Sequence, residues 1–296
     1  MTIRKAQKTD IPQILLLLSE LNQKVSPERW RPFFTFGVGK EEVDFGHVLE
    51  VDDEIQGFLG TVYSRRKYNN CFFDCCNIHG WIVREKYKHY SLKLMTEVLK
   101  QDMVFTCFSA MELTQVVLKR LKFFYIHHAF RIFRPYPFIS ITKISVSLLN
   151  NPEAILASEE KELFKVHRKF GSVFVLLKKE GKTCLLIFKP ETYFPAWLKI
   201  FSLFIPEKKR RLLKLEYIGD QDFFSEHFKS IAFKLMRKGD CLGFIVSNKM
   251  VERAGLVLTK KYFGQRPYMY RYNKDSFGEE FPDTLYSEMF VLNHKG

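Results

Sequence analysis

The sequence of 296 residues lacks the features that mark membrane-spanning, secreted or disordered chains. No window approaches the roughly eighteen consecutive apolar residues of a spanning helix. The opening, MTIRKAQKTDIPQILLLL, does not have the charged-then-apolar arrangement ending in small residues that marks a signal peptide, so we expect a cytoplasmic protein. Six cysteines at irregular spacing do not indicate a disulfide framework.

Phenylalanine and positive charge, in contrast, are abundant. Thirty Phe among 46% apolar residues provide enough material for a packed core and exclude general disorder. The 47 Lys and Arg against 33 Asp and Glu give a net charge of +14. Such an excess favours an anionic partner, which is a nucleic acid, a phosphate-bearing cofactor or a membrane surface. A solvated lysine-rich surface explains some of the charge, and the charge alone does not choose among these partners.

One succession of elements, hairpin, strand, helix, strand, helix and strand, occurs twice along the chain. In the first half we predict these elements at residues 47–66, 75–83, 91–101, 103–110, 112–123 and 134–146. In the second half we predict them at residues 172–189, 213–219, 224–239, 240–247, 248–262 and 266–273. Repetition of this kind predicts an α/β (α+β mixed sheet) fold of two similar halves, residues 1–148 and 149–296. One large mixed sheet is the alternative.

The stretch REKYKHYSLKLM (84–95) places basic and polar residues where a predicted strand passes into a helix. A helix start presents unpaired backbone N–H groups and the positive end of the helix dipole, which bind phosphate oxygens. Lys86, Lys88 and His89 surround this helix start, and Ser91 stands where a helix cap is expected. The pattern predicts a pyrophosphate site, and an ordinary capped helix with a solvated basic turn is the alternative.

These residues and the order of the elements resemble the GNAT superfamily of N-acetyltransferases. WIVREKYKHYSLKLMTEVL (81–99) is similar to the family's pyrophosphate loop, with Val83 ending the strand, Lys88 in the turn and a Leu-rich helix after it. FTCFSAMELTQVVLKRLKF (105–123) resembles the strand and helix that follow. The resemblance covers residues 1–145 closely and residues 165–275 by element order. The family's glycines are missing from residues 88–92, and Leu118 stands where the family often has a tyrosine acid.

The resemblance implies a tandem GNAT-like fold and an acyl-CoA-dependent N-acyltransferase. It implies acetyl transfer from acetyl-CoA, or another acyl-CoA, to an amine such as an amino sugar of a surface polysaccharide. The implied coenzyme-binding residues are Trp81, Ile82, Val83, Lys86, Lys88, His89, Tyr90, Ser91 and Leu92. The matching stretch of the second half, EYIGDQDFFSEHF (216–228), is acidic where the first is basic, so we expect one coenzyme per chain.

Three residues are candidates for a role in catalysis. Amine acylation needs a proton acceptor, and His79, four residues before Val83, is the best-placed one. A buried histidine hydrogen-bonded to the backbone is the alternative for His79. Ser109 and Thr106, at the end of the next strand, are positioned to orient the leaving thiol or the substrate, or else they are strand-end and capping hydroxyls.

Metal binding is not predicted. Cys71, Cys75, Cys76 and His79 lie close in the sequence, but zinc sites usually have Cys pairs separated by a longer loop, and no second pair follows.

Residues 194–211 combine an aromatic and aliphatic run with Lys208, Lys209, Arg210 and Arg211. This combination predicts peripheral contact with an anionic membrane, or a buried connector helix with a solvated basic end.

Two functions other than N-acyl transfer stay open. One is a Fem-like aminoacyl transferase that uses aminoacyl-tRNA, favoured by the +14 charge but opposed by the absence of sustained heptads. The other is a non-catalytic binding module on a decayed transferase fold, favoured by the missing glycines and tyrosine.

Overall fold

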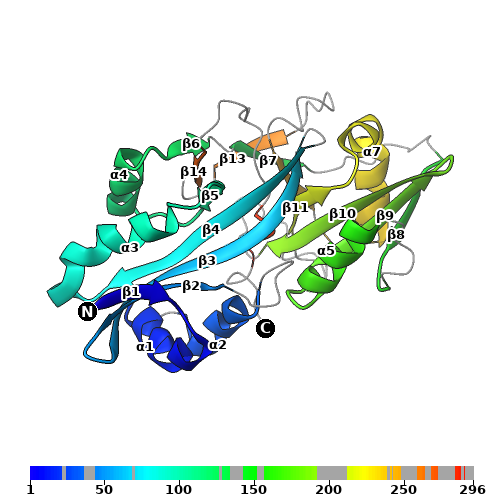
Figure 1. The fold of residues 1–296 in the computed structure, drawn as a ribbon. Helices are drawn as coiled ribbons and strands as arrows, with labels where there is room; N and C mark the ends of the chain where they lie inside the picture. Colours follow the sequence, from blue (N-terminus) through cyan, green and yellow to red (C-terminus); the bar gives the residue numbers. More distant parts are fainter. Residues whose placement is uncertain are drawn as a thin grey trace, which may run out of the picture. The chain divides into compact units, whose positions relative to one another are not determined.

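The computed structural model describes residues 1–21, 25–36, 44–68, 71–126, 129–133, 143–151, 157–191, 212–238, 241, 243–247, 259–263, 268–272, 284–287 and 290. The chain divides into two compact units (Figure 1). Unit 1 comprises residues 1–127 and 266–296, and unit 2 comprises residues 128–265. Each unit contains one seven-stranded mixed sheet. Among the helices of the described ranges, none has the length and apolar character needed to cross a membrane.

Unit 1 has a sheet in which only one pair of strands is parallel. In spatial order its strands are β1 (Thr2–Lys5), β2 (Gly46–Val51), β3 (Glu54–Tyr68), β4 (Cys71–Val83), β5 (Val104–Cys107), β14 (Tyr268–Arg271) and β6 (Phe124–Ile126). The β4–β5 pair is parallel, and the other pairs are antiparallel. The predicted first hairpin is confirmed as β2 and β3, and Asp52 and Asp53 at its turn both have positive φ, as a tight two-residue hairpin turn requires.

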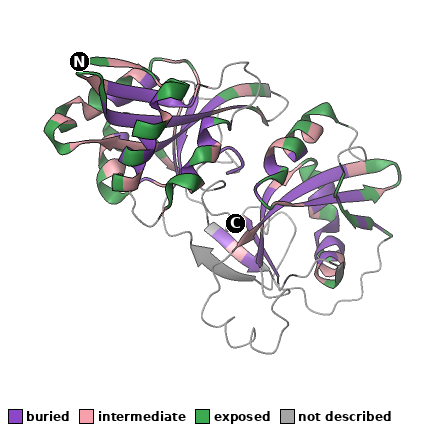
Figure 2. Cartoon of the chain, turned by 90° about the horizontal axis from the view of Figure 1, so that it is seen from below, coloured by how far each residue is buried: buried purple, intermediate pink, exposed green. Residues whose placement is uncertain are grey.

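Helices cover both faces of the unit 1 sheet. They are η1 (Lys8–Asp10), α1 (Ile11–Leu21), α2 (Pro27–Trp30), η2 (Arg31–Phe34), η3 (Glu85–Tyr90), α3 (Ser91–Val98) and α4 (Glu112–Arg120). Side chains alternate between the faces of a strand. Cys76 and Ile78 of β4 join one core with Leu94, Leu118 and other residues of α3 and α4. His79 packs on the opposite face against the rings of Trp30 and Phe33. Figure 2 shows the buried residues concentrated on the strands.

Unit 2 repeats this plan. Its strands are, in spatial order, β13 (Thr259–Phe263), β7 (Ala129–Phe133), β12 (Gly243–Ser247), β11 (Leu212–Ile218), β10 (Lys182–Glu191), β9 (Val173–Lys179) and β8 (Ser145–Leu148). α7 (Gln221–Lys238) packs Phe224 and Phe228 into a core with Leu186 on one face. α5 (Ser158–Arg168) lies on the other face, where the rings of Phe164 and Phe174 are 4.5 Å apart. Two similar sheets confirm the predicted fold class of two similar halves.

Each sheet contains strands from both halves of the sequence: β14, from residues 149–296, lies in the first sheet, and β7 and β8, from residues 1–148, lie in the second. β14 lies between β5 and β6 of the first sheet, with Met269 opposite both Cys107 and Tyr125. β7 follows β6 in the chain but lies between β12 and β13 of the second sheet, with Ile132 opposite both Ile245 and Lys260. Each sheet is therefore completed by a strand from the other half of the sequence. The compact units divide at residues 127/128 and 265/266, whereas the sequence analysis predicts a single division at residues 148/149.

Some predicted elements differ from the structure. The segment 266–273 was expected to close the second half, but its strand β14 belongs to the first sheet. Residues 134–142 of the predicted strand 134–146 lie outside the described residues, and β8 starts the second sheet after them. The helix predicted at residues 248–262 is wrong at its end, because residues 259–263 form β13. Residues 248–258 lie outside the described residues, as does the predicted membrane-contact segment 194–211.

Candidate active site

The first feature of the candidate site is a fork between β4 and β5. These parallel strands are paired from Cys75 to Asn77 on β4 and from Val104 to Thr106 on β5. β5 ends at Cys107, but β4 continues to Val83. Beyond Asn77 the two strands therefore separate, and the edge of β4 that faced β5 loses its pairing among the described residues. We call this opening the fork. The other edge of β5 is paired with β14, which fixes β5 in place.

A β-bulge in β4 lies next to the fork. On the β3 side, Gly60 pairs with His79 and Phe58 pairs with Ile82, so Leu59 opposes two residues of β4. The extra residue is accommodated at Gly80, which has φ +57°, a left-handed conformation that favours glycine. A Cβ atom at Gly80 would lie 2.9 Å from Cδ2 of Leu18 in α1. A bulge bends a strand, so the backbone N–H groups of β4 change direction at the open edge of the fork.

His79, the predicted base, lies beside the bulge in an aromatic enclosure. Its side chain faces α2 and η2, where the ring centroid of Phe33 is 4.4 Å away and that of Trp30 is 6.2 Å away. Gly60 lies opposite, and a Cβ atom there would collide with the imidazole. Neither ring nitrogen has a hydrogen-bond partner among the described residues. Burial lowers the pKa of His79 to about 3, so the ring is neutral at pH 7.

Asn77 joins the two strands at the base of the fork. Its Nδ2 atom donates hydrogen bonds to the backbone oxygen of Thr106 at 3.3 Å and to Thr106 Oγ1 at 3.1 Å. Both residues are buried, with 2% and 3% of their surface exposed. Oδ1 of Asn77 is buried and has no partner in the described part of the chain. The sequence analysis missed Asn77, although an asparagine two residues before His79 in an apolar strand was a usable signal.

The predicted phosphate-binding residues surround the start of α3. Lys88 Nζ lies 2.9 Å from Glu85 Oε2, and both side chains are exposed. Lys86 Nζ lies 5.2 Å from the ring centroid of Tyr87. The prediction that Ser91 caps the helix is wrong, because η3 runs directly into α3. Tyr90 stands at the cap position and makes no side-chain capping bond, and the Ser91 N–H bonds to the Lys88 carbonyl.

The remaining predicted residues lie on both sides of the helix start. His89 and Tyr90 have ring centroids 4.0 Å apart. Ile82 and Val83 are half-buried beyond the bulge, and Leu92 is exposed.

Three further side chains around the fork bear on catalysis. Trp81 is half-buried, and its Nε1 atom has no partner within the described ranges. Ser109 is half-buried in the turn between β5 and α4. Leu118, where the family often has a tyrosine acid, is fully buried in the core of unit 1.

Unit 2 contains a second fork of different chemistry. The parallel pairing of β11 and β12 ends at Lys214 and Ile245, and β11 continues to Ile218. The register between β10 and β11 shifts at Glu216, which shows that β11 has a bulge just after this pairing ends. Lys214 Nζ lies 2.7 Å from Glu216 Oε1, where Glu216 is buried and Lys214 is half-buried. The helix after this strand has acidic residues at its start, where Asp220 Oδ1 accepts a hydrogen bond from the Phe223 N–H at 2.9 Å.

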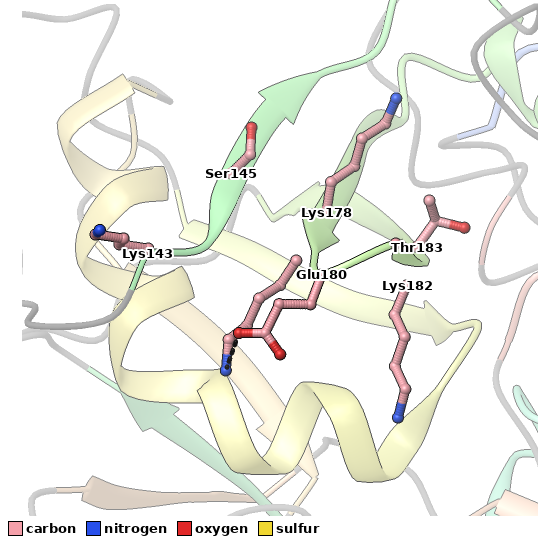
Figure 3. A pocket seen from close by; sticks show the side chains of 8 residues that line it. Lys143, Ser145, Lys178, Glu180, Lys182 and Thr183 are labelled. Carbon is pink, nitrogen blue, oxygen red and sulfur yellow. Dashed lines mark ion pairs between the residues drawn. The ribbon is translucent and has the colours of Figure 1, made fainter.

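Unit 2 also has a lysine-rich pocket at the β9–β10 turn. Its volume is about 430 Å³, and it is lined by Lys143, Ser145, Lys178, Lys179, Glu180, Gly181, Lys182 and Thr183. Figure 3 shows that Lys178 and Lys182 point in opposite directions from the hairpin. Lys179 is paired with Glu180 at 3.8 Å. The ammonium groups do not converge on one point, so this pocket lacks the geometry of a phosphate site.

The thiols of Cys75, Cys76 and Cys184 are buried and form no disulfide bond. Burial raises the pKa of Cys75 to about 12, so its thiol stays protonated and unreactive at neutral pH. Within the described ranges, no group of three or more His, Cys, Asp and Glu residues is placed to hold a metal ion.

The comparisons with known proteins define the fold. No family model matches the sequence, and the comparison with curated proteins finds no relative. Solved structures do match. A GCN5-related N-acetyltransferase from Anabaena variabilis is 12% identical with a TM-score of 0.59, over 91% of this chain and 72% of that one. Eis1 from Mycobacterium abscessus is 11% identical with a TM-score of 0.56, over 92% and 74% of the two chains.

A third match is the GCN5-related glucosamine N-acetyltransferase region of a fungal multi-domain β-N-acetylglucosaminidase. It is 10% identical with a TM-score of 0.55, over 91% of this chain and 38% of that one. Because each match covers more than nine-tenths of this chain, the likeness includes both units. The protein therefore has the tandem fold of the GCN5-related acyltransferases, as the sequence analysis predicts.

Proposed function

We propose that this protein is an acyl-CoA-dependent N-acyltransferase that transfers an acetyl group from acetyl-CoA to an amine. The observation that carries the proposal is the fork in unit 1, with a bulge in β4 on one side of it and a lysine-bearing turn at the start of α3. The bulge and the open edge of β4 directly precede the lysine-bearing turn in the chain, so one continuous surface is available for the thioester, the pantetheine arm and the pyrophosphate of an acyl-CoA.

The residues of unit 1 fit such a co-substrate in two respects. An extended pantetheine arm can lie along the open edge of β4 as an added strand does. Lys86 and Lys88 provide positive charge around the start of α3, where a pyrophosphate would lie. His89 and Ser91 stand where glycine would permit the closest backbone approach to phosphate. We therefore expect the phosphates to be held mainly by side chains.

The chain's own groups supply the conditions for the transfer. The amine nitrogen attacks the thioester carbonyl, a C–N bond forms, the C–S bond breaks, and the amine proton passes to a base while the thiolate takes up a proton. Backbone N–H groups near Trp81–Val83 would stabilise the negative charge that develops on the carbonyl oxygen. His79, being neutral, can accept a proton if the acceptor or a water reaches it past Trp30 and Phe33. Ser109 would orient the leaving thiol.

The acceptor is proposed to be a primary amine, with an amino sugar as the leading candidate. The support is the glucosamine N-acetyltransferase region that shares the fold. We further propose that only unit 1 binds the coenzyme. Support comes from the acidic residues Asp220 and Asp222 at the start of α7, where a pyrophosphate would be repelled.

Thermal unfolding with acetyl-CoA, at varied concentration, tests the proposal. A ligand at a hundred times its dissociation constant should stabilise the protein by about 2.7 kcal/mol. Glu85→Gln should strengthen acetyl-CoA binding several-fold, because it frees Lys88 from its ion pair. Glu97→Gln is the matched control, since it frees Lys100 from an i,i+3 pair at the other end of α3 and should change little.

Two outcomes would count against this function. Absence of stabilisation by any acyl-CoA, together with salt-sensitive tRNA binding, would favour the aminoacyl-tRNA alternative. Stabilisation that is equal in the wild type and both variants would show that the phosphates lie elsewhere than at the start of α3.

A further inference from the structure

We propose that the hydrogen-bonded pair Asn77–Thr106 sets the width of the fork, which makes Asn77 a positioning residue for acyl-CoA binding. The inference rests on the proposed function, because the fork must hold the pantetheine arm for its width to matter. It assigns to these two residues a role that the sequence analysis did not give them.

The position of the pair is the first reason. Asn77 and Thr106 are the last residues at which β4 and β5 are paired. Beyond them β5 ends at Cys107 while β4 continues through the bulge at Gly80, and no further pairing of the two strands follows in the described residues. At this point the side chain of Asn77 provides the two hydrogen bonds that hold the strands together. Since both residues are buried, water does not compete for these bonds.

The orientation of the amide is the second reason. The backbone oxygen of Thr106 can only accept a hydrogen bond, so the NH2 group of Asn77 must face it. This orientation leaves Oδ1 of Asn77 buried without a partner among the described residues. An unsatisfied buried oxygen is unfavourable for folding, and an apolar pair of similar size would avoid it. Stability alone therefore does not explain an asparagine here, whereas control of the strand separation does.

The second fork provides an internal comparison. The corresponding last pair in unit 2 is Lys214 and Ile245. Isoleucine has no side-chain oxygen to receive a bond across the fork, and Lys214 instead pairs with Glu216 on its own strand. The Asn77–Thr106 bridge thus joins the two strands of the fork in unit 1, which is the fork beside the lysine-bearing turn. In the fork of unit 2, an ion pair within one strand, Lys214–Glu216, stands at the corresponding position.

The test measures two ligands on four variants. The ligands are acetyl-CoA and 3′-phospho-ADP, the nucleotide part of coenzyme A, which lacks the pantetheine arm. Thr106→Val removes one acceptor of the bridge, Thr106→Ser keeps it, and Asn77→Leu combined with Thr106→Val removes the bridge altogether. Cys75→Val is the control, because Cys75 lies on the same strand two residues earlier, where the pairing with β5 is intact.

We expect Thr106→Val to weaken acetyl-CoA binding on the order of tenfold, as the loss of one buried hydrogen bond predicts. The double variant should weaken it further while the unfolding temperature stays close to that of the wild type. Thr106→Ser and Cys75→Val should bind acetyl-CoA as the wild type does. Binding of 3′-phospho-ADP should be unchanged in all four variants, since it does not occupy the fork.

Three results would contradict this inference or the proposed function on which it rests. Equal weakening of both ligands would show a general structural role, and unchanged acetyl-CoA binding in the double variant would show that the bridge does not set the fork. Both overturn this inference and leave the proposed function in place. If the wild type binds neither ligand, the proposed function itself fails.

Discussion

At the scale of single residues, His79 is the most informative side chain. Its imidazole is buried between aromatic rings without a hydrogen-bond partner in the described part, and burial lowers its pKa to about 3. The sequence analysis weighed a base against a histidine bonded to the backbone. The structure shows the burial but no such bond, so proton acceptance by His79 stays a prediction.

The lowered pKa of His79 predicts how stability depends on pH. In the unfolded chain a histidine has a pKa of about 6.5. Between pH 6.5 and pH 3 the unfolded chain therefore binds a proton that the folded protein does not, and stability is lost as the pH falls. From pH 7 to pH 5 we expect a loss of about 2 kcal/mol from this group.

Denaturant unfolding at pH 7 and pH 5 measures this loss. His79→Gln should reduce the pH dependence by about that amount, and the exposed His89→Gln should leave it unchanged. A His79→Gln variant with the same pH dependence as the wild type would show that the imidazole is hydrated in the folded protein.

At the scale of elements, the end of α4 shows a local strain. Lys122 follows this helix with φ +64°, a left-handed conformation that favours glycine. The Phe123 N–H bonds to the Leu118 carbonyl at 3.0 Å, which closes the helix end.

Lys122→Gly should relieve this strain and stabilise the protein by about 0.5 to 1 kcal/mol. The gain is below the full cost of a left-handed residue, because glycine also has more freedom in the unfolded chain. Lys100→Gly, at the end of α3 where φ is not positive, should not stabilise. If both substitutions change the free energy of unfolding in denaturant by the same amount, Lys122 is not strained in the folded protein.

The sequence predicted the elements whose signals are local. Both hairpins were found from alternating apolar residues around a polar turn, and Glu180 and Gly181 at the second turn have the expected positive φ. β6 and β7 were missed, because each is short and lies in an aromatic stretch with no clear alternation. The cap at Ser91 was wrong because a 3₁₀ turn before a helix leaves no simple signal in the sequence.

At the scale of the whole molecule, the exchange of strands between the two sheets could not be predicted from the sequence. The sequence of residues 266–273 predicts a strand but does not show which sheet the strand joins. The pairing of Met269 with Cys107 and Tyr125 in the structure places it in the first sheet. The candidate site shows the same limit. The region around Val83 and a bulged central strand were implied by charge and resemblance, but the Asn77–Thr106 bridge arises from contacts between two strands and was not predicted.

The exchange predicts that the first half of the sequence does not fold alone. A chain of residues 1–148 lacks β14, so β5 and β6 lose the strand between them and one side of the fork loses its support. We expect this chain to be unfolded or aggregated by circular dichroism and size exclusion. Adding residues 266–296 as a separate peptide should restore structure. A well-folded monomer of residues 1–148 would contradict the observed pairing.

The central claim is that the fork of unit 1, and not that of unit 2, holds an acyl-CoA. Isothermal titration of the full chain with acetyl-CoA tests it most directly, because it reports affinity and stoichiometry together. We predict one molecule bound per chain, with the affinity reduced by Lys88→Ala and unaffected by Lys214→Ala. A stoichiometry of two, binding that is lost with Lys214→Ala alone, or no heat with any acyl-CoA would contradict it.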